Sequence, residues 1–198
     1  MDFPTQSSPY LPASGGVSRL MVRVILALVP AMLLMFWYFG WGVLFNLGLA
    51  ALTALVAEAL VLLARRRPVA ATLRDGSALL TGLLLAMTLP PLASWWIPVL
   101  GSGFAIVIAK QLYGGLGYNP FNPAMVGFVV LIISFPLQMT LWPPPVGLLD
   151  DSALGLADTV RMIFTGVLPD GRTLDSLTMA TPLDTAKPHL TLDYTWTE

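Results

Sequence analysis

Two long apolar runs, residues 24–39 and 43–64, most constrain what this chain can fold into. The first has 16 residues without a charge, and the second has 22 residues interrupted by one asparagine and by Glu58. As helices, the first spans about 24 Å and the second is long enough to cross roughly 30 Å of hydrocarbon. Hydrophobic residues make up 56% of the chain and charged residues 11%, whereas soluble domains have roughly 45–50% and about 25%. We therefore predict two membrane spans and exclude a water-soluble globule.

Three shorter apolar segments follow. Residues 77–89 and 97–109 have 13 residues each, about 20 Å as helix, which is too short for an ordinary span. They form either two short or tilted crossings or one re-entrant hairpin. Residues 124–142 form a last apolar run, in which Pro136 predicts a kink. The predicted fold class is an all-α integral membrane protein with about five transmembrane or half-membrane helices and an extracytoplasmic polar loop.

The distribution of basic residues predicts the orientation of the spans. Short cytoplasmic loops are enriched in Lys and Arg, and such residues flank the two long runs on one side: Arg19, Arg23, Arg65, Arg66 and Arg67. We therefore expect residues 1–19 to form a flexible cytoplasmic N-terminus, residues 20–142 to lie in the membrane, and residues 143–198 to lie outside. Arg74 and Lys110 are expected to emerge together on one side of the membrane.

Tryptophan positions indicate the same orientation independently. Membrane interfaces are enriched in Trp and Tyr. Five tryptophans fall at boundaries that the charge distribution puts outside: Trp37, Trp41, Trp95, Trp96 and Trp142. The sequence after Trp142 is polar, acidic and rich in Pro, Asp and Thr, as expected of an extracytoplasmic loop.

The residue inventory excludes several kinds of chemistry. The chain has no cysteine, so it supplies no disulfide and no thiolate ligand for an iron–sulfur cluster. Its one histidine, His189, has no ligand partner at a suitable spacing, so we expect no metal site. A net charge of −1 does not indicate a nucleic-acid partner. Redox chemistry in this chain would need an organic cofactor.

Glu58 is the one acidic residue inside a predicted span. A carboxylate at membrane depth is costly unless it faces the protein interior or water, so it indicates a cation or proton site. We place Glu58 in the cytoplasmic half of its span, on the ion pathway. The alternative is that Glu58, seven residues from Arg65, lies near the inner interface and is merely solvated.

Residues 113–124 have the sequence YGGLGYNPFNPA and precede the last apolar run. Asn before Pro is typical of a helix start, because the Asn side chain caps free N–H groups and Pro at the first helical position loses no hydrogen bond. We expect Asn119, Asn122 and the glycines to form a tight turn whose helix start points into the protein. An ordinary turn between spans is the alternative. Asn-Pro half-helices and Glu58 also fit a passive channel or solute transporter without a redox cofactor.

A second loop, residues 175–184, has the sequence DSLTMATPLD. Pro182 biases Thr181 toward an extended backbone, which keeps its hydroxyl off a helix and accessible to a modifying enzyme. From the residues alone, a plain surface loop is the favoured interpretation of this pattern.

Three stretches together resemble the D subunit of the Rnf (Rsx) ion-translocating electron transport complex. They are IAKQLYGGLGYNPFNPAMVG (108–127), AEALVL (57–62) and SALLTGLLLA (77–86). The resemblance extends from about Ser18 to Lys187, and the family is similar to the B subunit of the sodium-pumping NADH:quinone reductase. Family members are much longer and have two related halves, so the resemblance implies that this chain corresponds to an N-terminal half.

The resemblance implies a covalent FMN, joined by a phosphoester bond to Thr181. Asp175, Thr178, Ala180 and Thr181 match the family motif Asp-x-x-Ser/Thr-x-Ala-Ser/Thr, with Met179 where many such motifs have Gly. The first three of these would be recognised by an extracytoplasmic flavin transferase, which transfers FMN from FAD.

The resemblance also implies the setting in which the chain works. It would be a multi-pass subunit in the bacterial inner (plasma) membrane, with a cytoplasmic N-terminus and residues 143–198 in the periplasm. Its partners would be the other subunits of the complex, the flavin transferase during maturation, and membrane lipid. The whole complex would couple electron exchange between ferredoxin and NAD to Na⁺ or H⁺ movement. The chain would be one component of a translocase and not catalytic on its own.

Overall fold

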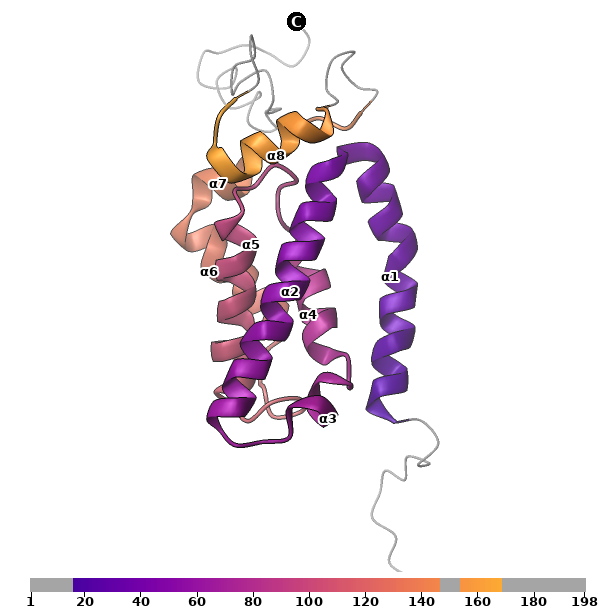
Figure 1. Cartoon of the computed structure of the whole chain (residues 1–198), viewed down its shortest axis with the longest axis vertical. Coiled ribbons are helices and arrows are strands. Elements are labelled where there is room, and N and C mark those ends of the chain that lie inside the picture. The colour runs from indigo at the N-terminus through magenta and orange to yellow at the C-terminus, as the bar shows by residue number, and fades with distance from the viewer. Residues whose placement is uncertain (1–15, 147–153, 169–198) are drawn as a thin grey trace, which may run out of the picture.

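Two long antiparallel helices begin the fold. The computed structural model describes residues 16–146 and 154–168, and within these ranges the secondary structure is helical, without a β-strand. Helix α1 (Val17–Phe39) and helix α2 (Trp41–Ala64) are joined at Gly40 (Figure 1). Gly40 has a φ of 73°, in the left-handed region that glycine adopts without steric cost. Both helices are long and apolar enough to cross a membrane by length and composition, as predicted.

The shorter apolar segments complete a bundle around α2. After the short helix α3 (Val69–Leu73), helix α4 (Ser77–Ala86) runs back alongside α2, and α5 (Trp96–Phe104) continues as the π-helix η1 (Ala105–Gln111). Helix α6 (Pro123–Ser134) packs against α4, α5 and η1. Together these helices form the all-α fold of a membrane protein, as the sequence predicts.

The connection between α4 and α5 lies near the start of α2. Its Pro90 carbonyl oxygen accepts a hydrogen bond from Asn46 Nδ2 at 2.8 Å, one turn into α2. At the opposite end, Ser77 and Lys110 lie level with Glu58, near the end of α2. Segments 77–89 and 97–109 therefore run alongside α2 between the levels of Asn46 and Glu58, and two short crossings and a re-entrant hairpin both stay open as predictions.

Glycines let the central helices approach closely. A Cβ on Gly82 of α4 would lie 2.7 Å from the carbonyl oxygen of Ala50 on α2, and one on Gly127 of α6 would lie 2.7 Å from that of Gly101 on α5. No real Cβ is found this close to a backbone oxygen, so the helix spacing depends on these glycines. Small residues at helix contacts are typical of membrane bundles, where close packing replaces the hydrophobic effect as the attractive force.

The predicted kink lies where the sequence places it. Helix α6 ends at Ser134, Phe135 has the non-helical angles φ −135° and ψ 56°, and α7 (Pro136–Thr140) begins at the proline. Proline cannot continue a helix without losing a backbone hydrogen bond.

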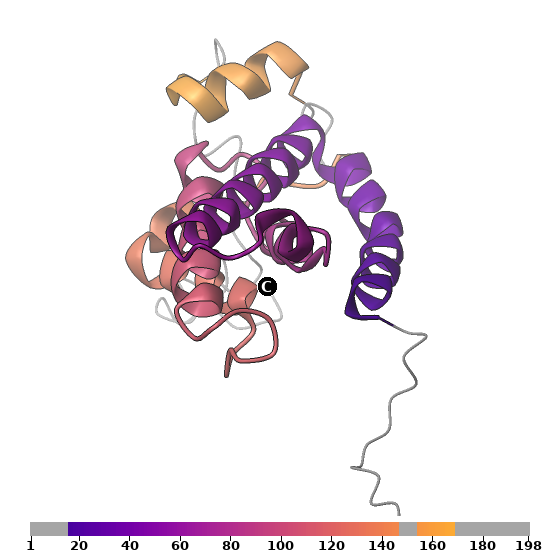
Figure 2. The ribbon, with the colours of Figure 1, turned by 60° about the horizontal axis from the view of Figure 1, so that its bottom comes forward.

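Helix α8 (Leu156–Thr165) lies across one end of the bundle (Figures 1 and 2). The carbonyl oxygen of Ile163 accepts a hydrogen bond from the backbone N–H of Trp95 at 3.1 Å, and Phe164 packs edge-on against Phe45 of α2. We call this the tryptophan end, because it holds Trp37, Trp41, Trp95, Trp96 and Trp142. The opposite, arginine end holds the start of α1 and Arg65, Arg66, Arg67 and Arg74. Among the described arginines, Arg161 on α8 lies at the tryptophan end.

Candidate functional site

A buried polar cluster joins α2, α4 and η1 near the arginine end. The ammonium Nζ of Lys110 donates hydrogen bonds to Glu58 Oε1 and to Ser77 Oγ, each at 2.6 Å. Gln111 Nε2 donates a third bond of 2.6 Å to Glu58 Oε1. Glu58 is 0% exposed and Lys110 2%, so the ion pair lies inside the protein. We call Glu58, Lys110, Gln111 and Ser77 the Glu58 cluster.

The position of Glu58 distinguishes the two interpretations of its sequence context. A carboxylate at the inner interface would be hydrated, whereas Glu58 is fully enclosed. It lies on the bundle-facing side of α2 together with Asn46, Ala50, Ala54 and Leu62, which recur every four residues. The solvated-interface alternative is therefore wrong, and the carboxylate faces the protein interior as its cost in lipid requires.

Lys110 lies at the same end of the bundle as Arg74, as expected, because its ammonium contacts Ser77, three residues after Arg74. The expectation that Lys110 emerges there is wrong, since its side chain is 2% exposed. Instead its side chain turns inward and meets a carboxylate that lies 52 positions away in the sequence. Because an isolated buried charge is far more costly than a paired one, each group makes the burial of the other possible.

The π-helix explains how neighbouring residues reach the same cluster. In an α-helix, consecutive side chains point in different directions. Within η1 the pattern is i to i+5, and it continues into the next turn: Leu112 N–H bonds to the Val107 carbonyl at 3.0 Å and Gly115 N–H to that of Lys110 at 3.1 Å. Ala109, Lys110 and Gln111 are all buried. Such π-helical turns are rare and occur often at functional sites.

A continuous hydrogen-bonded chain leads from the Glu58 cluster toward the arginine end. Ser77 Oγ accepts from Lys110 and donates to Asp75 Oδ1 at 2.6 Å, and the same carboxylate oxygen accepts from Ser77 N–H at 2.7 Å. Asp75 is partly exposed. The cluster is thus linked through a single hydroxyl to a second carboxylate at the protein surface.

Two oxygen atoms of the cluster have no hydrogen-bond partner among the residues that the structure describes. They are Glu58 Oε2 and Gln111 Oε1, and both are buried. Leaving a buried acceptor unsatisfied costs about 1–3 kcal/mol, so most buried polar groups are paired. The Glu58 cluster is therefore incomplete as a hydrogen-bond network.

The turn between η1 and α6 begins the last apolar run with the predicted cap. Asn122 Oδ1 accepts a hydrogen bond of 3.0 Å from Ala124 N–H, and Pro123 occupies the first helical position, so the predicted cap is confirmed. However, Asn122 is exposed, as are Tyr118 at 76% and Phe121 at 67%. Ala124 at the helix start and Gly115 are buried. That the helix start faces protein and not lipid stays a prediction.

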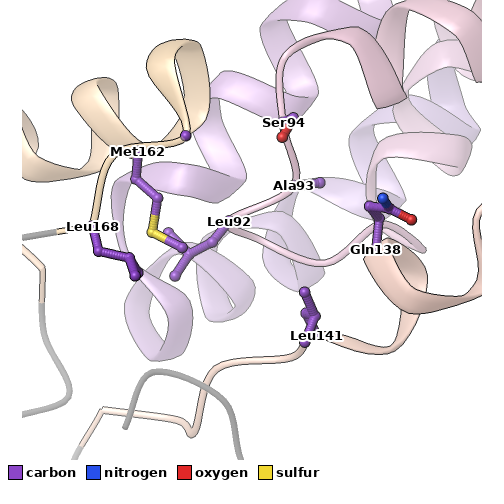
Figure 3. A pocket seen from close by; sticks show the side chains of 8 residues that line it. Leu92, Ala93, Ser94, Gln138, Leu141, Met162 and Leu168 are labelled. Carbon is purple, nitrogen blue, oxygen red and sulfur yellow. The ribbon is translucent and has the colours of Figure 1, made fainter. Parts of the chain in front are cut away.

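The tryptophan end contains a small apolar cavity (Figure 3). Its volume is about 140 Å³, and it lies between the α4–α5 connection, α7 and α8, lined by Leu92, Ala93, Ser94, Gln138, Leu141, Met162, Gly166 and Leu168. Figure 3 shows Leu92, Met162 and Leu168 converging from two elements, with Gln138 and Leu141 opposite. Sites for drug-sized ligands usually measure about 300–1,000 Å³, so this cavity is small by comparison.

The predicted flavin-loop residues are not part of this geometry. Asp175, Thr178, Ala180 and Thr181 lie outside the described residues, as does His189. In the part of the chain that the structure describes, no group of three or more His, Cys, Asp or Glu side chains is arranged to hold a metal ion.

Sequence reasoning missed three members of the Glu58 cluster: Ser77, Lys110 and Gln111. The only signal available was the pair Lys110-Gln111 directly after the apolar segment 97–109. A polar pair in that position is equally common at an interface, so the pattern alone does not distinguish an inward from an outward orientation.

The chain is similar to known proteins along nearly its whole length. It matches the model of the NQR2, RnfD, RnfE family over residues 4–198. It belongs to this family. Among the relatives, the proteins of Salmonella newport and Salmonella paratyphi A that are named as the D subunit of the ion-translocating oxidoreductase complex are 55% and 56% identical over 197 aligned residues, which cover 96% of this chain. The protein of that name from Salmonella typhimurium is 55% identical over the same span.

The chain spans about half the length of the curated relatives it matches, 56% in each of these cases. The Glu58 cluster, α1 to α7 and the flavin-loop residues all fall inside the residues that the family matches.

Proposed function

We propose that this chain acts in an ion-translocating oxidoreductase complex, as a membrane subunit that carries electrons through an FMN on Thr181 and contributes Glu58 to the ion pathway. The observation that carries the ion-pathway part is the Glu58 cluster: a buried carboxylate in a span-length helix, paired with a lysine and linked to the surface through Ser77 and Asp75. Ionisable groups at membrane depth typically mark ion or proton routes.

The names of the relatives support this proposal, since each contains the words ion-translocating oxidoreductase complex. In our proposal the complex lies in the bacterial inner membrane and couples electron exchange between ferredoxin and NAD to ion movement. The arginine end faces the cytoplasm and the tryptophan end faces the periplasm. The cluster Arg65, Arg66, Arg67 and Arg74 at one end, against the single Arg161 among the described residues of α8 at the other, supports this orientation, because basic residues favour the inside and tryptophans the interface.

The FMN proposal depends on the chemistry of the loop. A phosphoester needs a hydroxyl, and Thr181 supplies one within the sequence Asp175-x-x-Thr178-x-Ala180-Thr181. When bound, the flavin supplies one- and two-electron transfer, while the protein supplies position and electrostatics. A redox role without cysteine ligands requires such an organic group.

The test of flavin attachment uses the full-length subunit co-expressed with a flavin transferase. We expect mass spectrometry to find FMN on the peptide that contains Thr181, Thr181→Ala to abolish the flavin, and Thr181→Ser to retain it because the hydroxyl remains. Thr185→Ala is the matched control, since it removes a nearby hydroxyl outside the motif. FMN mapped to another residue would contradict the assignment.

The test of the ion pathway uses Glu58→Gln in the assembled complex. This substitution preserves size and the hydrogen bond from Lys110 while removing the charge that offsets the dehydration of a cation. We expect electron-transfer-driven ion transport in proteoliposomes to be lost. Asp158→Gln at the surface of α8 is a control for removal of an unrelated carboxylate. Transport with unchanged coupling in Glu58→Gln would overturn this role.

The passive-channel alternative has less support. Its two features were the Asn-Pro helix start and Glu58, but Asn122 lies exposed at the bundle end and the charge of Glu58 is balanced by Lys110. A fluorescent flavin band that survives denaturing electrophoresis distinguishes the two proposals, because a passive channel carries no covalent flavin.

A further inference from the structure

We propose that Lys110 is an internal cation that fills the ion site of Glu58, and that an alkali-metal cation takes the place of its ammonium group during transport. This inference rests on the proposed role of Glu58 in the ion pathway. It adds two points: the Lys110 ammonium occupies the site and competes with the transported ion, and the surrounding oxygen atoms are the ligands of that ion.

The position of Lys110 Nζ already has the surroundings of a cation site. The ammonium lies 2.6 Å from a carboxylate oxygen of Glu58 and 2.6 Å from the hydroxyl oxygen of Ser77. Both side chains are buried, with 0% and 4% exposure. Hard metal cations prefer oxygen ligands, carboxylates above all. A cation in this position would therefore meet a charged and a neutral oxygen ligand without rearrangement of either.

The two unpaired oxygens extend this ligand set. Glu58 Oε2 and Gln111 Oε1 are buried without partners in the described part of the chain. Gln111 Nε2 donates a hydrogen bond to Glu58 Oε1. The unpaired oxygens belong to the same amide and carboxylate groups, so they lie in the same part of the cluster. A metal ion bound between these oxygens would satisfy both. A proton on Glu58 Oε2 would also pair them, by donating to Gln111 Oε1, so the dependence on Na⁺ measured below distinguishes the two occupants.

A displaced Lys110 has a second carboxylate available. Ser77 Oγ bonds both the ammonium and Asp75 Oδ1, so one hydroxyl separates Lys110 from a carboxylate that is partly exposed. Movement of the ammonium toward Asp75 leaves a metal cation to neutralise Glu58. No charge is left buried without a counter-charge at either stage, which is the condition for a low barrier inside the protein.

The π-helix provides a way for Lys110 to withdraw. The i to i+5 pattern holds one more residue per turn than the α-helical pattern, and η1 is continuous with the α-helical α5. Return of this turn to the α-helical pattern would shift the register by one residue and rotate Lys110 away from Glu58.

The experiment compares Lys110→Met with Lys110→Arg in the full complex, reconstituted in liposomes. Na⁺ is the probe, and choline replaces it at constant ionic strength. If Lys110 holds the site in about nine molecules of ten, its removal lowers the half-saturating Na⁺ concentration about tenfold. Lys110→Arg keeps a positive charge in place and is not expected to lower it. An unchanged value in Lys110→Met, or an equal decrease in Lys110→Arg, would overturn the inference.

A second measurement covers the case in which Lys110→Met loses transport. The thermal unfolding temperature of the solubilised complex is followed against NaCl and against choline chloride. Since a ligand that binds the folded state stabilises it, NaCl should raise the unfolding temperature of Lys110→Met more than that of the natural complex. In the double variant Glu58→Gln/Lys110→Met this Na⁺-specific increase should be absent. Equal responses in all three forms would contradict a cation site at Glu58.

The outcomes separate this inference from the proposed function. Unchanged transport in Glu58→Gln contradicts the ion-pathway role itself. Loss of transport in Glu58→Gln, combined with unchanged Na⁺ dependence in Lys110→Met, contradicts only the role of Lys110. Transport by the natural complex that needs no alkali-metal cation also overturns the role of Lys110 while leaving Glu58 on a proton pathway.

Discussion

Helices α1 and α2 are alike in sequence character and different in surroundings. They have 23 and 24 residues, and both are long and apolar enough to cross a membrane. No residue of α1 is buried, whereas α2 buries seven: Gly42, Val43, Asn46, Ala50, Ala54, Glu58 and Leu62. Figure 2 shows α1 standing beside the bundle while α2 lies within it. Hydropathy therefore identifies a span but does not tell a peripheral from a central one.

The small and polar side chains of α2 account for the difference. The backbone of Ala50 contacts Gly82, and Asn46 and Glu58 form hydrogen bonds to other segments. In lipid, helices associate through close packing and interhelical hydrogen bonds. Helix α1 offers bulky apolar groups on nearly every side, including Leu26, Leu33 and Leu34 at about 60% exposure. Lipid solvates such a surface as well as another helix does.

The largest effect is expected when the charge pair of α2 is broken. Glu58→Leu leaves the Lys110 ammonium buried without a counter-charge, which destabilises by about 3–5 kcal/mol. The double variant Glu58→Leu/Lys110→Met removes both charges and should recover most of that loss. Unfolding in mixed detergent–SDS micelles, followed by far-ultraviolet circular dichroism, measures the free energy of unfolding of the single and the double variant. A double variant as unstable as the single one would show that the pair does not act as a unit.

A smaller effect is expected from widening the contact between α2 and α4. In Gly82→Leu the new side chain begins 2.7 Å from the Ala50 carbonyl oxygen, and overpacking of this kind costs about 1–3 kcal/mol. Gly48→Leu on α2 is the matched control, because nothing lies within 4 Å of a Cβ there. The same micelle titration should show a clear loss for Gly82→Leu only. Equal losses would mean that helix propensity, and not packing, governs both sites.

The smallest effect is expected on α1. Leu33→Ala truncates a side chain that is 62% exposed, and surface truncations of this kind usually change stability by less than about 0.5 kcal/mol. Leu62→Ala on α2 removes the same atoms from a side chain that is 1% exposed, at a cost of about 2–5 kcal/mol. A large loss for Leu33→Ala in the assembled complex, but not in the isolated subunit, would identify α1 as a contact with another component.

Several features of the fold follow from local sequence. Pro136 ends α6 because it cannot continue the helical hydrogen bonding. Asn122 and Pro123 begin α6 because the Asn122 side chain caps a free N–H and proline loses no hydrogen bond at the first helical position. Gly40 permits the reversal between α1 and α2 through its positive φ. Each effect acts within a few residues of the side chain that causes it, so the sequence is sufficient to predict it.

The sequence by itself determined the apolar spans, their breaks and the arginine cluster after α2, since each depends on the identity of nearby residues alone. Only the tertiary structure decided that Lys110 turns inward and that α1 stays outside the core. A lysine beside an apolar segment can extend to water or pair with a buried carboxylate. Which orientation Lys110 adopts depends on whether Glu58 lies within reach of its ammonium group. That carboxylate is 52 residues away in sequence and 2.6 Å away in space, a proximity that exists only once α2, α4 and η1 have packed together.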